Sequence, residues 1–151
     1  MRVKTILMAA AAVSSIGMAN IGLANAGDDF EVSANVAFTT DYRFRGISLS
    51  DNNFAVQGGF DVGHSSGLYV GTWASNVELG DGQGTTELDL YGGYAGEAGS
   101  IGYDVGVLLY AYPGSDDLNY YELYGSLSGE AGPVGLTAGL AYVPEQDNTE
   151  N

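Results

Sequence analysis

The sequence contains no cysteine and very few basic residues. Its lysines and arginines are Arg2, Lys4, Arg43 and Arg45, so no lysine follows position 4. The lack of cysteine excludes disulfides and thiol catalysis. Nineteen aspartates and glutamates give the chain a formal net charge of −15. Such a surface repels phosphate backbones, so nucleic acid is excluded as a partner.

A long apolar run is also missing after residue 26, where nothing approaches the roughly 20 residues of a membrane helix. Residues 1–26 begin with two basic residues, continue with an apolar stretch and end in Ala24-Asn25-Ala26. This small-x-small ending is the pattern that signal peptidase cuts. We therefore predict a cleaved signal peptide over residues 1–26. A transmembrane helix is the alternative, but polar Ser14, Ser15 and Asn20 interrupt the run.

The rest of the chain shows apolar and polar residues in alternation. From Val32 to Phe44 the even positions are mostly apolar and the odd positions mostly polar, which is typical of a strand between two different environments. Twenty-four glycines and eleven tyrosines also favour strands and turns over helices. The alternation recurs and predicts seven strands, most of them about 9–13 residues long. They cover approximately 32–44, 54–62, 68–77, 88–94, 101–112, 121–127 and 134–143.

The connections between these strands alternate in length. Those at 65–67, 96–100 and 129–133 are short, and those at 46–53, 78–84 and 113–118 are longer. Short turns that alternate with longer loops are typical of transmembrane barrels, whose short turns are periplasmic. Tyrosines near the strand ends suggest two aromatic girdles. The predicted girdle residues are Tyr69, Tyr94, Tyr103, Tyr110, Tyr112, Tyr120, Tyr121 and Tyr142.

The predicted fold class is therefore all-β, an antiparallel up-and-down transmembrane β-barrel. A soluble secreted β-sandwich explains the alternation equally well. It explains the strand lengths, the turn asymmetry and the tyrosine positions less well.

Several motifs resemble the TorF-type porin family of proteobacterial outer-membrane proteins. They are the runs at 39–48, 55–59, 66–77 and 87–94, together with Tyr112-Pro113-Gly114 before an Asn-Tyr-Tyr-Glu run. The resemblance covers nearly all of the chain after residue 26. It implies an outer-membrane β-barrel that acts as a porin.

The predicted organisation is a signal peptide at 1–26, β-barrel strands at 27–143, and an acidic polar tail or truncated loop at 144–151. Seven strands is an odd number, whereas bacterial single-chain barrels have an even number. We therefore interpret the chain as an N-terminal portion of a longer barrel. The alternative is a small eight-stranded barrel with one strand missed near the N-terminus.

Charged residues on the polar strand faces are the candidate pore lining. Asp41, Arg43 and Arg45 share one face of the first predicted strand. Two arginines opposite carboxylates in a narrow lumen set ion selectivity, or else form an interior salt-bridge network, and both interpretations stay open. The predicted pore-lining residues are Asp41, Arg43, Arg45, Gln57, Asp61, Glu87, Asp89, Asp104 and Glu122.

Other motifs carry weaker signals. The glycine-rich run at 80–84 lacks the lysine and the strand–loop–helix context of a phosphate loop. The acidic groups at 51–53 and 116–117 fit solvated loops better than calcium sites. His64 adjoins two serines at a turn, which favours a capping role over catalysis. No cofactor, metal or catalytic residue is predicted.

The predicted function is passive passage of small polar solutes or ions, with a preference for cations, through a non-enzymatic protein of the cell outer membrane. The expected partners are outer-membrane lipid and small polar solutes or cations. A non-conducting structural or adhesive barrel is the main alternative. An outer-membrane enzyme is a further one, but no residue triad supports it.

Overall fold

The computed structural model describes residues 18–23, 29–80 and 82–146. Strands dominate these residues, and the one helical segment among them is a short 3-10 turn, η1 (Asp116–Leu118). The prediction of an all-β chain is therefore confirmed. Within the described residues, no helix is long and apolar enough to span a membrane.

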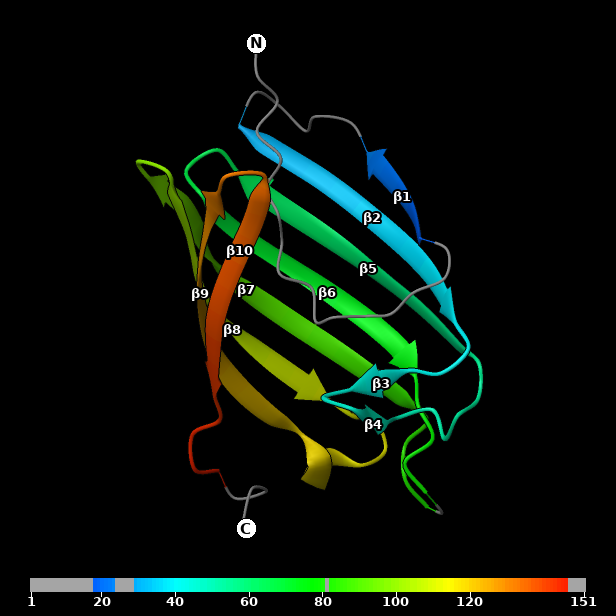
Figure 1. Ribbon diagram of the computed structural model, residues 1–151. Helices are drawn as coiled ribbons and strands as arrows, with labels where there is room; N and C mark the ends of the chain where they lie inside the picture. Colours follow the sequence, from blue (N-terminus) through cyan, green and yellow to red (C-terminus); the bar gives the residue numbers. More distant parts are fainter. Residues whose placement is uncertain (1–17, 24–28, 81, 147–151) are drawn as a thin grey trace.

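The strands form one antiparallel sheet and a small separate hairpin (Figure 1). The sheet has the order β1-β2-β5-β6-β7-β8-β9-β10, so neighbours in the sheet follow one another along the chain apart from the hairpin β3–β4. The strands of the sheet are β1 (Met18–Leu23), β2 (Phe30–Thr39), β5 (Ala55–His64), β6 (Leu68–Asn76), β7 (Thr86–Ala98), β8 (Ile101–Ala111), β9 (Tyr120–Ala131) and β10 (Val134–Tyr142). The hairpin consists of β3 (Arg43–Phe44) and β4 (Ile47–Ser48).

The seven predicted strands correspond to β2 and β5–β10. Their lengths run from 9 residues in β6 and β10 to 13 in β7. The short turns 65–67, 99–100 and 132–133 lie at one end of the sheet, and the loops 40–54, 77–85 and 112–119 lie at the other. The turn asymmetry predicted from the sequence is therefore present.

The predicted signal peptide falls mostly outside the described residues. Within it, only Met18–Leu23 is described, as strand β1 paired with β2. β1 makes the sheet eight-stranded, and a strand missed near the N-terminus is the alternative to the predicted count of seven. Cleavage after residue 26 stays a prediction.

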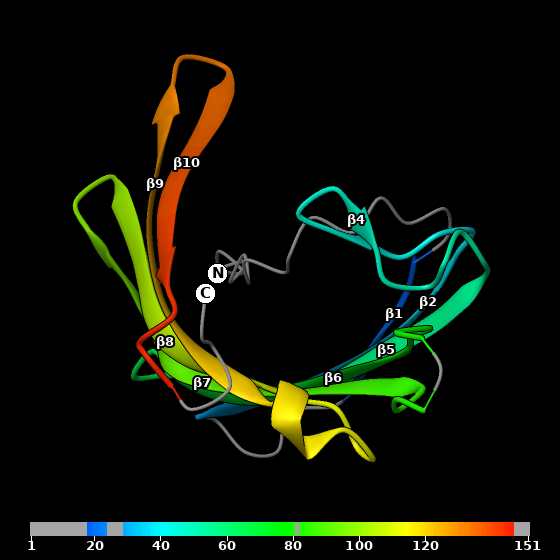
Figure 2. The same cartoon turned by 90° about the horizontal axis from the view of Figure 1, so that it is seen from below.

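The sheet is strongly curved but open (Figure 2). Among the described residues no ladder joins β10 to β1 or β2. The described strands therefore form an open antiparallel sheet, and the membrane barrel of which the sequence predicts them to be a portion stays a prediction. The hairpin lies over the concave side of the curved sheet.

The two faces of the sheet have opposite chemistry. We call the concave side the inner face and the convex side the outer face. Strand register assigns alternate residues to each face, and apolar side chains point outward in every strand from β2 to β10 of the sheet. Exposed outer-face residues include Phe38, Phe60, Val70, Leu90, Val107, Leu123, Leu127, Leu136 and Leu140. The buried polar side chains of the sheet strands lie on the inner face. The inner face is therefore polar and the outer face is apolar.

Candidate functional site: the inner face and its hairpin

Buried carboxylates on the inner face are held by tyrosine hydroxyls. Glu87, on β7, is 1% exposed. Tyr42 donates a hydrogen bond to its Oε1 at 2.6 Å, and Tyr112 donates to its Oε2 at 2.7 Å. Each carboxylate oxygen therefore has one phenol donor, and hydrogen bonds to a charged acceptor are stronger than neutral ones.

Two further tyrosine–carboxylate contacts lie nearer the short turns. The Tyr91 hydroxyl donates to Asp61 across β6, and this contact passes directly over Gly71, where a Cβ would collide with both side chains. Tyr69 donates to Asp104 at 2.6 Å and also meets the Tyr124 hydroxyl. Because a hydroxyl has one hydrogen, Tyr124 donates to Tyr69.

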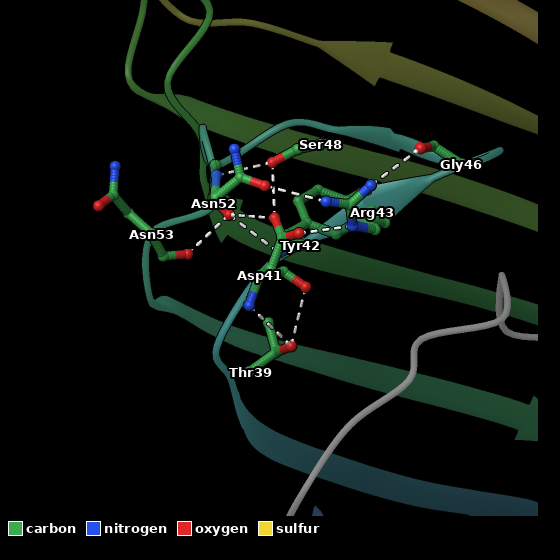
Figure 3. Close-up of polar contacts among 9 residues, drawn as sticks. Thr39, Asp41, Tyr42, Arg43, Gly46, Ser48, Asn52 and Asn53 are labelled. Atoms are coloured by element: carbon green, nitrogen blue, oxygen red, sulfur yellow. Dashed lines mark hydrogen bonds and ion pairs between the residues drawn. The ribbon is translucent and has the colours of Figure 1, made fainter.

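The hairpin β3–β4 is ordered by a compact set of polar contacts (Figure 3). The carboxylate of Asp41 accepts a hydrogen bond from Ser48 Oγ at 2.5 Å and pairs with Arg43 Nε at 2.5 Å. Arg43 also donates to Asn52 Oδ1 at 2.9 Å. The Tyr42 backbone N–H donates to Ser50 Oγ at 2.9 Å. These bonds turn the chain away from β2 immediately after Thr39.

The tip of the hairpin reaches the far side of the inner face. Arg45 and Gly46 both have positive φ (47° and 89°), as expected for a two-residue hairpin turn. From this tip, Arg45 Nη2 pairs with Glu122 Oε2 on β9 at 2.5 Å. The neighbouring Phe44 ring packs edge-on against Tyr110, with centroids 5.8 Å apart. The hairpin therefore links the β2–β5 side of the sheet to β9.

A small apolar cluster anchors the base of the hairpin. Tyr42, Ala55 and Val77 are buried together, with Leu49 and Trp73 among the partly buried residues packed around them. Tyr42 meets the Trp73 ring edge-on, at 5.4 Å between centroids. The hairpin is therefore fixed at its base by apolar packing and at its tip by an ion pair.

The ionised groups at the hairpin hold it against the inner face at neutral pH. The hydrogen bond from Ser48, followed by the bond and charge of Arg43, lowers the pKa of the Asp41 carboxyl. The stability that these contacts of Asp41 contribute is present above the ordinary aspartate pKa and is lost as pH falls through the lowered pKa. Burial, followed by the Glu87 charge, raises the pKa of the Tyr42 hydroxyl above that of an ordinary phenol. The stability gained from Tyr42 is therefore present below about pH 10 and lost as pH rises further.

Six predicted pore-lining residues lie on the inner face, on the strand faces that alternation assigned to them. They are Gln57, Asp61, Glu87, Asp89, Asp104 and Glu122. Asp41, Arg43 and Arg45 do not share a face of the first strand, because β2 ends at Thr39 and these residues belong to the hairpin segment. Arg43 pairs locally with Asp41, and Arg45 alone of the two arginines reaches a strand carboxylate.

The predicted aromatic girdle is only half on the outer face. Tyr94 and Tyr103 stack there near the short turns, and Tyr121 and Tyr142 are exposed there near the long loops. The other predicted members, Tyr69, Tyr110, Tyr112 and Tyr120, point inward, which corrects the prediction. A tyrosine near the end of a strand can lie on either face of the sheet, and the two-residue period of the strand determines which one. By that period Tyr69, Tyr110 and Tyr120 share a face with the inner carboxylates.

Sequence reasoning missed four aromatic residues of the site: Tyr42, Trp73, Tyr91 and Tyr124. Tyr91 and Tyr124 lie on the polar side of their alternation, which could have identified them as inner-face hydrogen-bonding residues. Tyr91 donates to Asp61, and Tyr124 donates to the Tyr69 hydroxyl. Tyr42 gave no such signal, because its position continued the apolar face of the preceding strand. Only the inward turn after Thr39 carries it to Glu87.

The weaker motifs behave as local structure. The Ser66 backbone N–H donates to His64 Nδ1 at 3.1 Å, which confirms a turn-capping histidine. Asn52 is engaged by Arg43, and residues 116–117 lie in the 3-10 turn η1. Within the described part of the chain, no group of three or more potential ligands is arranged to hold a metal ion.

The fold and site together define an antiparallel sheet with an apolar convex face and a tyrosine–carboxylate concave face. Residues 23–150 match the model of a family described as "Bacterial protein of unknown function (Gcw_chp)". The chain therefore belongs to this family. No curated protein and no solved structure matches it.

Proposed function

We propose that this protein is a porin-like β-barrel of the bacterial outer membrane that passes small polar solutes or ions and prefers cations. The observation that carries the proposal is the inverted distribution of side chains over the sheet. Large apolar residues are exposed along the whole outer face, and Leu140 is 85% exposed. Carboxylates, Gln57 and Ser75 are buried on the inner face.

A soluble β-sandwich buries the apolar face of its sheets against a second layer. Among the described elements, each sheet strand packs against its sheet neighbours, and the hairpin lies on the concave side, so none of them covers the outer face. A continuous exposed apolar surface is unusual in soluble proteins, and lipid is the solvent in which it is stable. The outward-facing Tyr94, Tyr103, Tyr121 and Tyr142 lie toward the two ends of this surface, as interfacial tyrosines do.

The proposal requires that the free edges of the sheet be paired in the membrane. Unpaired N–H and C=O groups are not tolerated in lipid, so spanning sheets are closed. Among the described residues, β1 and β10 are the outer strands of the sheet, and theirs are the edges that closure has to pair.

The cation preference follows from the charges on the inner face. Five carboxylates face inward, and the Arg45 guanidinium pairs with one of them, Glu122. The five are Asp61, Glu87, Asp89, Asp104 and Glu122. A narrow lumen with low-dielectric walls focuses such a field and concentrates cations.

A non-conducting structural barrel is the second candidate, and the hairpin is the observation that favours it. Its tip is tied to β9 by the Arg45–Glu122 pair, so it extends across the concave side of the sheet. Ion conduction through the protein distinguishes a hairpin that narrows an open lumen from one that blocks it.

Cell fractionation tests the membrane part of the proposal. We expect the full-length protein to fractionate with outer membranes and to remain there in concentrated urea, because its apolar face is solvated by lipid. Recovery as a monodisperse protein in the periplasmic fraction would contradict the proposal and favour a soluble β-sandwich.

Planar-bilayer recordings test conduction and selectivity. We expect reversal potentials in a salt gradient to show cation preference, and Arg45→Ala to increase both this preference and the conductance. The variant removes the positive charge opposite Glu122 and frees the hairpin tip. Arg43→Ala is the matched control, because it removes an equal charge that pairs within the hairpin segment. No conductance at all supports the structural barrel, and anion selectivity contradicts the proposed lining.

A further inference from the structure

One buried carboxylate on the inner face stands apart from the others. Asp89 is 8% exposed, and its Oδ1 accepts no hydrogen bond from any described residue. The other buried carboxylates of the described chain are Asp61, Glu87 and Glu122, and each is bonded to a tyrosine or an arginine. A buried charge without a partner is costly, so Asp89 marks a place where a donor or cation is missing.

A second buried oxygen, on β5 two strands away, has the same deficiency. Gln57 is 2% exposed; its Nε2 donates to Ser75, but its Oε1 accepts no hydrogen bond within the described chain. The register places Gln57 opposite Ser75 on β6, and Asp89 opposite Trp73 two residues along the same strand. Both unsatisfied atoms are acceptors, so the group that would satisfy either of them is a donor or a cation and not an anion.

Aromatic side chains flank Asp89 on both neighbouring strands. Trp73 on β6 and Tyr110 on β8 lie directly opposite it in the ladders. Directly opposed side chains share a face, with Cβ atoms about 5 Å apart. Tyr42 packs edge-on against Trp73, and Tyr120 stacks on Tyr110 at 4.5 Å between centroids. Asp89 therefore lies among aromatic rings of the inner face, beside the base of the hairpin.

This chemistry favours an ammonium-type cation over a divalent metal ion. A carboxylate beside tryptophan and tyrosine rings attracts an ammonium group both by charge and by cation–π interaction. Calcium needs six to eight oxygen ligands, and magnesium needs octahedral coordination. The described residues contain no group of three carboxylates or histidines arranged for a metal.

We propose that Asp89, Trp73 and Tyr110 form a binding site on the inner face for a singly charged amine-type cation, with Gln57 Oε1 as a further acceptor. The site would hold the solute of a cation-preferring pore, and in that respect it rests on the proposed function. Binding itself requires only the folded inner face.

The chain contains a single tryptophan, so Trp73 reports on the site directly. The experiment is a titration of the full-length protein in detergent micelles with methylammonium chloride, with ionic strength held constant by sodium chloride. We expect a saturable change in Trp73 emission for the wild type. Asp89→Asn is expected to weaken binding about tenfold or more, because it removes the charge of the acceptor. The variant should fold as well as the wild type, since it removes an unpaired buried charge.

Asp61→Asn is the matched control, because it removes the same charge from the same face at a carboxylate already bonded to Tyr91. Because Asp61 also contributes to the negative field of the inner face, we expect this variant to lose clearly less affinity for methylammonium than Asp89→Asn. An equal loss in both variants would show general accumulation of cations and overturn the site. A wild-type emission that does not saturate would also overturn it and assign the Asp89 oxygen to water or a proton. The measurement needs no conduction, so a bound cation in a non-conducting protein would contradict the pore and leave the site standing.

Discussion

Replacing Val107 with arginine is expected to lower the free energy of unfolding in lipid vesicles by about 2–4 kcal/mol. Val107 is 44% exposed on the outer face, near the middle of β8, and lies between Gly92 and Leu123 in the ladders. At this depth an outward guanidinium would enter the hydrocarbon core. Unfolding in denaturant, followed by the emission of the single tryptophan, measures the change.

A matched control on the other face of the sheet tests whether lipid or water meets the outer face. Thr137→Arg adds the same charge to the inner face of β10, where Thr137 is exposed and lies opposite Ser128, and we expect a clearly smaller loss. If the outer face met water, Val107→Arg would be an ordinary surface substitution and change stability by no more than about 0.5 kcal/mol. That result would remove the main support for a membrane protein.

The hairpin is expected to open when its tip loses the ion pair on β9, and trypsin detects this opening. After Lys4, the sites for trypsin are Arg43 and Arg45, and both lie in the hairpin segment. Glu122→Gln removes the charge that pairs with Arg45 but keeps both cleavage sites. Loss of about 1–2 kcal/mol would raise the open population, and with it the cleavage rate, roughly 5–30-fold. Gel electrophoresis of timed digests measures the rate.

Glu130→Gln is the matched control, since Glu130 lies on the same strand and face as Glu122 but is exposed near the short turns. We expect it to be cleaved at the wild-type rate. Equal rates for Glu122→Gln and the wild type would show that the apolar base at Tyr42 holds the hairpin without the tip. Fast cleavage of the wild type itself would contradict the closed hairpin.

The strands and their faces could be predicted from the sequence because a two-residue period is a local property. Val56 and Gln57, or Leu90 and Asp89, are adjacent in the chain and must point to opposite faces of any strand. The lengths of the turns are likewise local, since glycine and proline at 67, 99 and 132–133 allow tight reversals.

The hairpin could not be predicted in the same way. Residues 41–45 continue the alternation of β2, and nothing in that pattern distinguishes a longer strand from one that ends at Thr39 and folds inward. The decision depends on contacts far apart in sequence: Tyr42 with Glu87, and Arg45 with Glu122. The same holds for the tyrosines, because a tyrosine suits a membrane interface and an inner-face hydrogen bond equally well.

The amino-acid sequence predicts an all-β chain of seven long strands, with polar residues on one face and apolar residues on the other. It does so because the alternation of side chains is set by the backbone of a strand. Which polar residues meet, and that β2 ends at Thr39, depend on the tertiary structure. Among the described residues, the tertiary structure also leaves the buried Asp89 Oδ1 without a hydrogen-bond donor. These features arise from the curvature of the sheet, which brings residues from distant strands within hydrogen-bonding distance across its concave face.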